Sequence, residues 1–181
     1  MNERRARERR ALIRGLAACG LAAVARPRLA RSNDLHLGAP APTAILTTLD
    51  GEHISTADLR GRVVLLTFWA TWCGPCRQEL PLLSSYAAQH SRDGLSVLGF
   101  SLDDAQDLKK VRAVAQTLSF PVGLVSSSSL PGYGRIWHIP VNFAIDRDGR
   151  LVDNGWKDKE ATWTAERLES IVTPLLRRSV G

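Results

Sequence analysis

Hydrophobic residues along the chain fall into continuous runs and periodic stretches that together predict a layered α/β domain. The runs VVLLTFWA (63–70) and GLSVLGFSLD (94–103) are apolar and rich in β-formers, which indicates strands buried on both faces. Residues 77–90 and 104–118 repeat apolar positions at helical spacing and predict two amphipathic helices. Residues 120–127 predict a third, short strand.

Segments on either side add a hairpin at each end of this pattern. Residues 43–61 mix apolar and polar positions around an Asp-Gly pair, which favours a β-hairpin. Residues 140–156 predict two strands joined by a second Asp-Gly turn, and residues 162–178 predict a final helix with Thr162 as its N-cap. This order predicts one α/β domain over residues 43–178, with a βαβ first half and antiparallel strands added late.

The first 25 residues differ from the rest of the chain. The basic start MNERRARERRALIR precedes the small apolar stretch GLAACGLAAVA, which is too short to span a bilayer comfortably. This order predicts an export signal over residues 1–25, and the paired arginines of RRALIRG resemble a twin-arginine signal. Ordinary secretion, a lipoprotein signal with Cys19 as the lipidated residue, an uncleaved anchor and a basic amphipathic surface helix are the alternatives. Residues 26–42 mix Pro, Arg and Ala and predict a linker.

The export prediction changes the interpretation of the charge. The whole chain carries a net charge of +6, but residues 1–25 hold six arginines and two glutamates. The remainder therefore has 18 basic and 16 acidic side chains and lacks the basic stripe that nucleic-acid binding needs. We expect a periplasmic protein without a nucleic-acid partner, with membrane association only through an uncleaved or lipidated N-terminus.

Two cysteines remain once Cys19 is assigned to the signal. Cys73 and Cys76 lie at the predicted junction of a strand and a helix, where unpaired N–H groups and the helix dipole favour a thiolate. A zinc site usually needs a second cysteine or histidine pair, and a disulfide closing so short a loop stabilises little. We therefore favour thiol–disulfide exchange over zinc binding and over a structural disulfide. Cys73 is the expected exposed nucleophile and Cys76 the buried resolving cysteine, with no metal and no cofactor beyond this redox pair.

The stretch FWATWCGPCRQELP (68–81) resembles the active site of the thioredoxin superfamily. Its trailing RQELP is similar to the exported TlpA/ResA-type thiol–disulfide oxidoreductases, and the resemblance includes LDGEHISTADLRGRVVLL and IPVNFAIDRDGRLV. The resemblance implies a three-layer thioredoxin-like α/β fold, with a central mixed sheet flanked by helices and an N-terminal β-hairpin extension. It also implies cysteine-containing protein substrates, such as apocytochrome c, and a membrane electron carrier as the reductant.

The resemblance assigns roles to residues around the cysteines. Pro140 matches the cis-proline of the family, and Ile139 before it would offer backbone groups to an extended substrate. Trp72 would shield the sulfurs and, with Gly74 and Pro75, line the docking surface.

One position departs from the thioredoxin pattern. Thioredoxin has a buried aspartate that accepts the proton of the resolving cysteine, and the matching residue here is Thr67. Asp103, at the end of the second buried strand, is the candidate replacement, because a buried carboxylate near sulfur can move protons. The alternative is that Asp103 or Asp104 only caps the next helix.

The direction of electron flow is inferred from the residues beside the cysteines. The Gly-Pro dipeptide and the isoleucine before Pro140 resemble reducing thioredoxins, so we expect a reductase, with cytochrome c maturation as one setting. The alternatives are a disulfide-forming oxidase and a non-catalytic thioredoxin-fold binding module. A thiol peroxidase shares the fold, but the chain lacks a proline-and-threonine pattern leading to a single peroxidatic cysteine.

Overall fold

The computed structural model describes residues 35–157 and 162–178 of the 181-residue chain. The predicted export signal, with Cys19, and the first part of the predicted linker lie outside the described residues. Within the two described ranges, no helix is long and apolar enough to cross a membrane.

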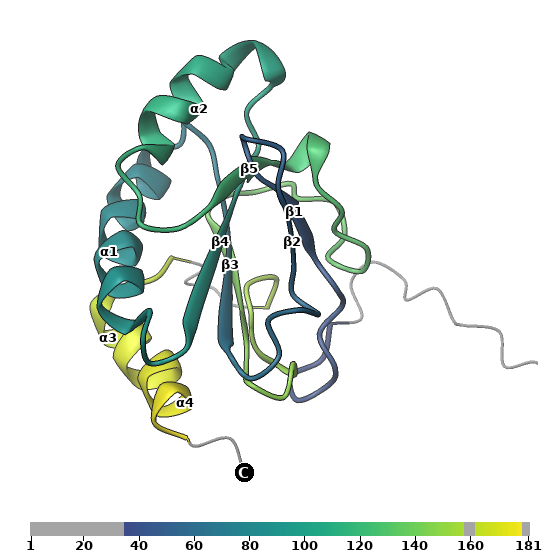
Figure 1. Ribbon diagram of the computed structural model, residues 1–181, viewed down its shortest axis with the longest axis vertical. Helices are drawn as coiled ribbons and strands as arrows, with labels where there is room; N and C mark the ends of the chain where they lie inside the picture. Colours follow the sequence, from purple (N-terminus) through teal and green to yellow (C-terminus); the bar gives the residue numbers. More distant parts are fainter. Residues whose placement is uncertain (1–34, 158–161, 179–181) are drawn as a thin grey trace, which may run out of the picture.

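A mixed five-stranded sheet with the strand order β5-β4-β3-β6-β7 forms the centre of the domain (Figure 1). Its strands are β3 (Val63–Trp69), β4 (Leu95–Ser101), β5 (Val122–Leu124), β6 (Val141–Ile145) and β7 (Leu151–Asn154). The first three run parallel, and β6 pairs antiparallel with both β3 and β7. All of β3 is buried, as its continuous apolar run predicts for a strand that is covered on both faces.

The helices lie on one face of this sheet (Figure 1). They are α1 (Gly74–His90), a 3₁₀ turn η1 (Ala105–Asp107), α2 (Leu108–Ala115), α3 (Ala165–Arg167), a π-helical segment η3 (Leu168–Val172) and α4 (Thr173–Arg177). The crossovers through α1 and α2 advance in the same direction across the parallel strands, so their shared handedness puts both helices on the same side.

The opposite face is covered by the N-terminal hairpin and by loops, including the 3₁₀ turn η2 (Val125–Ser127). Strands β1 (Ile45–Thr47) and β2 (His53–Ser55) pair antiparallel, which confirms the predicted hairpin. Leu46 packs from this hairpin against Phe68 and Phe100, while Leu65 and Trp69 of the same sheet face the helices. The three layers are therefore helices, sheet and hairpin with loops.

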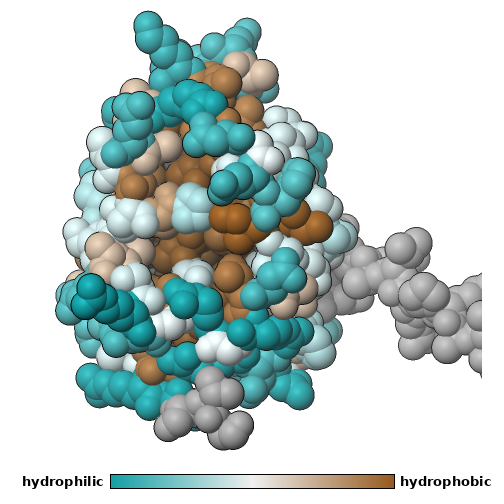
Figure 2. Space-filling model, viewed as in Figure 1, coloured by the Kyte–Doolittle hydropathy of each residue, from teal (hydrophilic) through white to brown (hydrophobic). Residues whose placement is uncertain are grey.

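The edge of β4 is only partly paired, because β5 reaches no further than Gly99–Ser101. Beside the unpaired part lies an apolar cavity of about 230 Å³, lined among others by Leu59, Ala87 and Leu98. Figure 2 shows apolar side chains in the middle of the side of the molecule that faces the viewer, between the helix layer and the hairpin layer.

Part of the predicted linker is built into the domain. Leu35 is buried, and Gly38 N–H donates to the Leu151 carbonyl of β7 at 2.7 Å. Ala41 N–H donates to the Gly149 carbonyl at 2.9 Å. The packed chain therefore starts no later than Leu35, before the predicted boundary at residue 43, because the apolar leucine and these backbone groups find partners on β7 and the turn before it.

The C-terminal helix starts later than predicted, and it is interrupted near Pro174. Its N-cap is Thr164, whose side chain accepts from Arg167 N–H at 3.2 Å, and not Thr162. Pro174 has no N–H to donate to the Ser170 carbonyl. The helical hydrogen-bond pattern widens to a π-helical segment around Ser170.

Candidate active site

The directions of β3 and β6 bring the CGPC segment and the loop before Pro140 to the same end of the sheet. Phe68 near the end of β3 pairs with Val141 at the start of the antiparallel β6. Cys73 follows β3 and Pro140 precedes the antiparallel β6, so the CGPC segment and the proline loop lie at the same end of these strands. β7 ends there as well, because Gly155 N–H donates to the Asn142 carbonyl at 2.9 Å.

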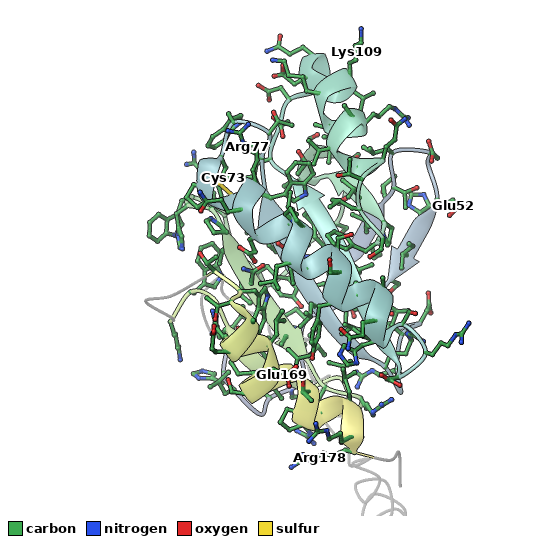
Figure 3. All side chains as sticks on the ribbon, turned by 90° about the vertical axis from the view of Figure 1, so that its left-hand side faces the viewer. Glu52, Cys73, Arg77, Lys109, Glu169 and Arg178 are labelled. Atoms are coloured by element: carbon green, nitrogen blue, oxygen red, sulfur yellow. A yellow bond between two sulfur atoms is a disulfide. The ribbon has the colours of Figure 1, made fainter. Side chains whose placement is uncertain are left out.

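Cys73 and Cys76 form a disulfide across the start of α1, with an S–S distance of 2.03 Å. Cys73 is the N-cap, and the backbone N–H of Cys76 donates to its Sγ at 3.2 Å. Gly74 and Pro75 fill the first turn, where a proline costs no helical hydrogen bond. Figure 3 shows Cys73 at the upper end of α1. Once the disulfide is reduced, the same N–H group and the helix dipole favour a Cys73 thiolate.

The two cysteines differ in exposure in the expected order. Cys73 is 6% exposed and Cys76 1%. Cys73 is therefore the more accessible sulfur, although in the disulfide form it is itself nearly covered. Trp72 beside it is 68% exposed, so this tryptophan is not a core residue and its docking role stays a prediction.

The Ile139–Pro140 peptide bond is cis, as the resemblance implied. Ile139 packs against the buried cluster that contains both cysteines, and Pro140 is buried at the start of β6. Ile139 thus packs against the cluster that includes both cysteines, Pro140 lies directly before β6, and the backbone docking role of Ile139 stays a prediction.

Asp103 holds the loop that leads to Cys73. It is 4% exposed, and its carboxylate accepts from Thr71 N–H at 2.8 Å, Thr71 Oγ1 at 2.6 Å and Ser101 Oγ at 2.7 Å. The following turn begins at Asp104 without a side-chain cap, so the structure does not support the capping alternative for either aspartate. Three donors already occupy the carboxylate, a geometry that suits fastening the loop. The proton-transfer role of Asp103 remains an untested prediction.

A second buried carboxylate, Glu79, lies one helical turn after Cys76 and was not among the residues predicted from the sequence. It is 3% exposed, and Asn142 Nδ2 donates to its Oε1 at 2.7 Å. Burial raises the pKa of Glu79 to about 7, against the opposing effects of the Trp163 backbone amide, the Asn142 side chain and the Arg167 charge. A carboxyl group with this pKa can take or give a proton near neutral pH.

Glu79 lies beside the position that the thioredoxin pattern leaves vacant. Thr67 of β3 pairs directly with Asn142 of β6, so the two side chains share a face of the sheet. That face carries the helices, and α1 brings Glu79 down onto Asn142. The available signal was the three-residue spacing from Cys76, which places Glu79 on the same side of a helix whose neighbouring leucines are buried.

Trp137 is a second residue that sequence patterns did not single out. Its indole is 75% exposed and stacks on Trp156 with ring centroids 6.1 Å apart and planes at 10°. Trp156 is held in turn, because its Nε1 donates to the Tyr133 carbonyl at 2.9 Å. Trp137 precedes Pro140 by three residues, so a fixed aromatic face lies close to the proline loop.

The described part of the chain contains no cluster of side chains suited to binding a metal ion. No group of three or more His, Cys, Asp or Glu side chains there is placed to hold a metal ion.

The chemistry that this arrangement supports is reversible disulfide exchange, and the protein is a thioredoxin-like thiol–disulfide oxidoreductase. Residues 37–154 match the model of the AhpC/TSA family, and the chain belongs to that family.

Comparison with known proteins gives the same class. The chain is 30% identical over 119 residues to "Thiol-disulfide oxidoreductase ResA" of Bacillus cereus, covering 66% of this chain and 69% of the relative. It is 37% identical over 119 residues to "Thioredoxin-like protein YneN" of Bacillus subtilis, covering 64% and 69%. A putative thiol:disulfide interchange protein DsbE from Chlorobium tepidum superimposes with a TM-score of 0.65 at 27% identity, over 78% of this chain and 99% of that one.

Proposed function

We propose that this protein is an exported reductase that opens disulfides in partner proteins through the Cys73–Cys76 pair. The observation that carries the exchange chemistry is the Cys73–Cys76 disulfide at the start of α1, with the buried Glu79 carboxyl group one turn after Cys76. The reducing direction rests on the Gly-Pro dipeptide and on the isoleucine before Pro140. Reduction of a partner requires Cys76 to lose its proton inside the protein, and Glu79 supplies an acceptor matched to neutral pH.

The proposed cycle transfers two electrons from the dithiol to the partner. The Cys73 thiolate attacks one sulfur of the partner's disulfide, and a mixed disulfide forms while the first partner thiolate leaves. Glu79 accepts the proton of Cys76, and the resulting thiolate attacks Cys73 Sγ. The second partner thiolate then leaves, and the Cys73–Cys76 disulfide is restored. A new cycle needs two electrons from an external dithiol, for which a membrane electron carrier is our candidate.

Two exposed indoles support a protein as the substrate. Trp72 and Trp137 border the edge where the redox pair and the proline loop meet. Exposed tryptophans next to a covered sulfur suit an extended polypeptide segment, which buries their rings while its cysteine reaches Cys73. The backbone of Ile139 would pair with the same segment.

Export is supported by the basic and apolar order of residues 1–25. Cytochrome c maturation is the setting that we propose for the partner.

The reduction potential of the Cys73–Cys76 pair tests the direction of electron flow. We expect a value closer to that of thioredoxin, about −270 mV, than to that of a strong oxidant, about −120 mV. A potential at the oxidising end would contradict the reductase and favour the disulfide-forming oxidase.

Trapping tests the substrate class. A Cys76→Ser variant cannot resolve the mixed disulfide, so partners should accumulate on Cys73 and be identified by mass spectrometry. The matched control is Cys73→Ser, which should capture none of them. Failure of Cys76→Ser to capture any cysteine-containing protein would count against protein-disulfide reduction, and preserved function in Cys73→Ser would favour the non-catalytic binding module.

A further inference from the structure

We propose that Asn142 and the Arg167–Asp153 ion pair are positioning residues that hold the Glu79 carboxylate and set the pH at which it exchanges its proton. The proposal deepens the proposed function, on which it rests for the origin of the proton. It concerns residues outside the CGPC motif, on β6, β7 and α3.

Asn142 fixes one oxygen of Glu79. It is fully buried in the second position of β6, and its Nδ2 donates to Glu79 Oε1 at 2.7 Å. The other oxygen, Oε2, has no hydrogen bond of standard geometry within the described residues. A donor to the charged form stabilises the carboxylate, so Asn142 makes ionised Glu79 easier to form in a buried place.

The ion pair between Arg167 and Asp153 places a largely buried positive charge on the helix side of the sheet. Arg167 Nη2 donates to both carboxylate oxygens of Asp153 at 2.8 Å, and both side chains are largely buried. The guanidinium also lies over the ring of Trp163, 4.6 Å from its centroid. The Trp163 backbone amide and the Arg167 charge both lower the pKa of Glu79, and the ion pair with Asp153 keeps the guanidinium in place against Trp163.

Sheet geometry explains why these groups meet. Asp153 of β7 pairs with Ala144 of β6, which is two residues after Asn142 and therefore points to the same face. Asn142 and Asp153 thus lie on the helix side of neighbouring strands. α1 supplies Glu79 to one of them and α3 supplies Arg167 to the other.

The groups that face Glu79 act in opposite directions. Burial raises its pKa to about 7, while the Trp163 amide, the Asn142 side chain and the Arg167 charge each lower it. Asp153 reduces the effect of Arg167 by neutralising part of its charge. Without the donors and the charge, the pKa would rise further, and Glu79 would stay protonated at neutral pH and accept no proton from Cys76.

The test is a titration of Glu79 in the oxidised protein, because disulfide-bonded cysteines do not titrate. Carboxyl ¹³C NMR follows the group, and Glu79→Gln identifies its resonance. We expect Asn142→Leu to raise the pKa by at least about 0.5 unit, and the double variant Asp153→Asn with Arg167→Gln to raise it by less, because Asp153 offsets part of the Arg167 charge. The double variant avoids leaving one charge of the pair buried alone.

The matched control is Arg77→Gln. Arg77 is an exposed cation two residues before Glu79 on α1, near Cys73 at the same end of the helix (Figure 3). Solvent screens its charge, so its removal should shift the Glu79 pKa by less than either network variant. Arg167→Lys keeps the charge and should remain closer to the wild type than the double variant does.

Shifts no larger than that of Arg77→Gln would overturn the proposal, as would a downward shift in either network variant. Circular dichroism at the same pH values establishes that each variant is folded, and Asn142→Leu and Arg167→Lys decide the test if the double variant does not fold. The titration requires no turnover. A protein that shows the shifts but reduces no partner would therefore refute the proposed function alone.

Discussion

Two buried carboxylates flank the redox pair, and they differ in their surroundings more than in their burial. Asp103, after β4, and Glu79, in α1, are 4% and 3% exposed. Asp103 accepts hydrogen bonds from Thr71 N–H, Thr71 Oγ1 and Ser101 Oγ, whereas the Asn142 amide is the side-chain donor to Glu79.

The difference shows that burial alone does not identify an acid–base group. Donors that satisfy a carboxylate fix its neighbours in place, as Asp103 fixes the loop before Cys73. A carboxylate with fewer donors loses hydration without full replacement, which is why burial raises the pKa of Glu79 to about 7. The predictions below test this contrast between a fastening and a proton-exchanging carboxylate.

The largest effect is expected from Glu79→Gln, which keeps the shape of the side chain and removes its proton chemistry. Resolution of the mixed disulfide at pH 7 should slow by about 100-fold or more, because general acid–base groups contribute on that scale. Stopped-flow measurement of partner-thiol release gives the rate. An unchanged rate would mean that another group, with Asp103 as the first candidate, accepts the proton.

Stability should depend on pH through Glu79. Its pKa in the folded protein lies above the ordinary value of 4.5, so between about pH 4.5 and 7 the folded state binds more protons than the unfolded state. The free energy of unfolding should therefore fall as pH rises through this window, by roughly 2–3 kcal/mol from this group. Urea unfolding at several pH values measures the slope, and Glu79→Gln should flatten it. A slope unaltered by that variant would contradict the raised pKa.

Asp103→Asn should act on stability and not on proton transfer. Loss of hydrogen-bond acceptance from Thr71 and Ser101 should lower the free energy of unfolding by about 1–3 kcal/mol. The midpoint of the pH profile for mixed-disulfide resolution should stay where it is in the wild type. A displaced midpoint would give Asp103 the proton-exchanging role that we assign to Glu79. The matched control Asp104→Asn alters an exposed neighbour and should change neither quantity measurably.

The smallest effect is expected outside both carboxylate regions. Trp137→Ala should lower kcat/KM for a protein disulfide by about two- to tenfold, the scale of one lost aromatic contact. It should leave the rate with a small-molecule disulfide and the pH profile unchanged, because Trp137 lies on the surface and not beside Glu79. An equal loss with both substrates would show that the variant disturbs the redox pair itself.

Much of the fold could be predicted because it depends on local patterns in the sequence. The buried run of β3, the Asp-Gly hairpin and the helix after Cys76 depend on periodicity and turn chemistry, and each is present. The cysteine pair and the cis bond before Pro140 followed from a contiguous motif and its resemblance.

The remaining parts depend on contacts between distant segments. Glu79 looks like a surface residue of an amphipathic helix until β6 places Asn142 beneath it. Asp103 contacts Thr71 only because β4 and β3 end side by side. The vacancy at Thr67 could be predicted from the motif, but the contact between Glu79 and Asn142, which places a carboxyl group beside it, could not.

The N-terminal segment has a consequence for how other chains can approach. Residues 38–41 bond to β7 and the turn before it, on one side of the sheet, and Thr48 and Leu49 bond to β5, the outer strand on the other. A Cβ on Gly123 would lie 1.9 Å from the Thr47 carbonyl oxygen, so a glycine is needed where this segment crosses β5. One stretch of chain thus caps both outer strands, which protects them from the strand-to-strand association through which exposed sheets aggregate. A partner segment that cannot add itself to these capped strands is left with the unpaired part of β4 and the loops around Cys73 and Pro140.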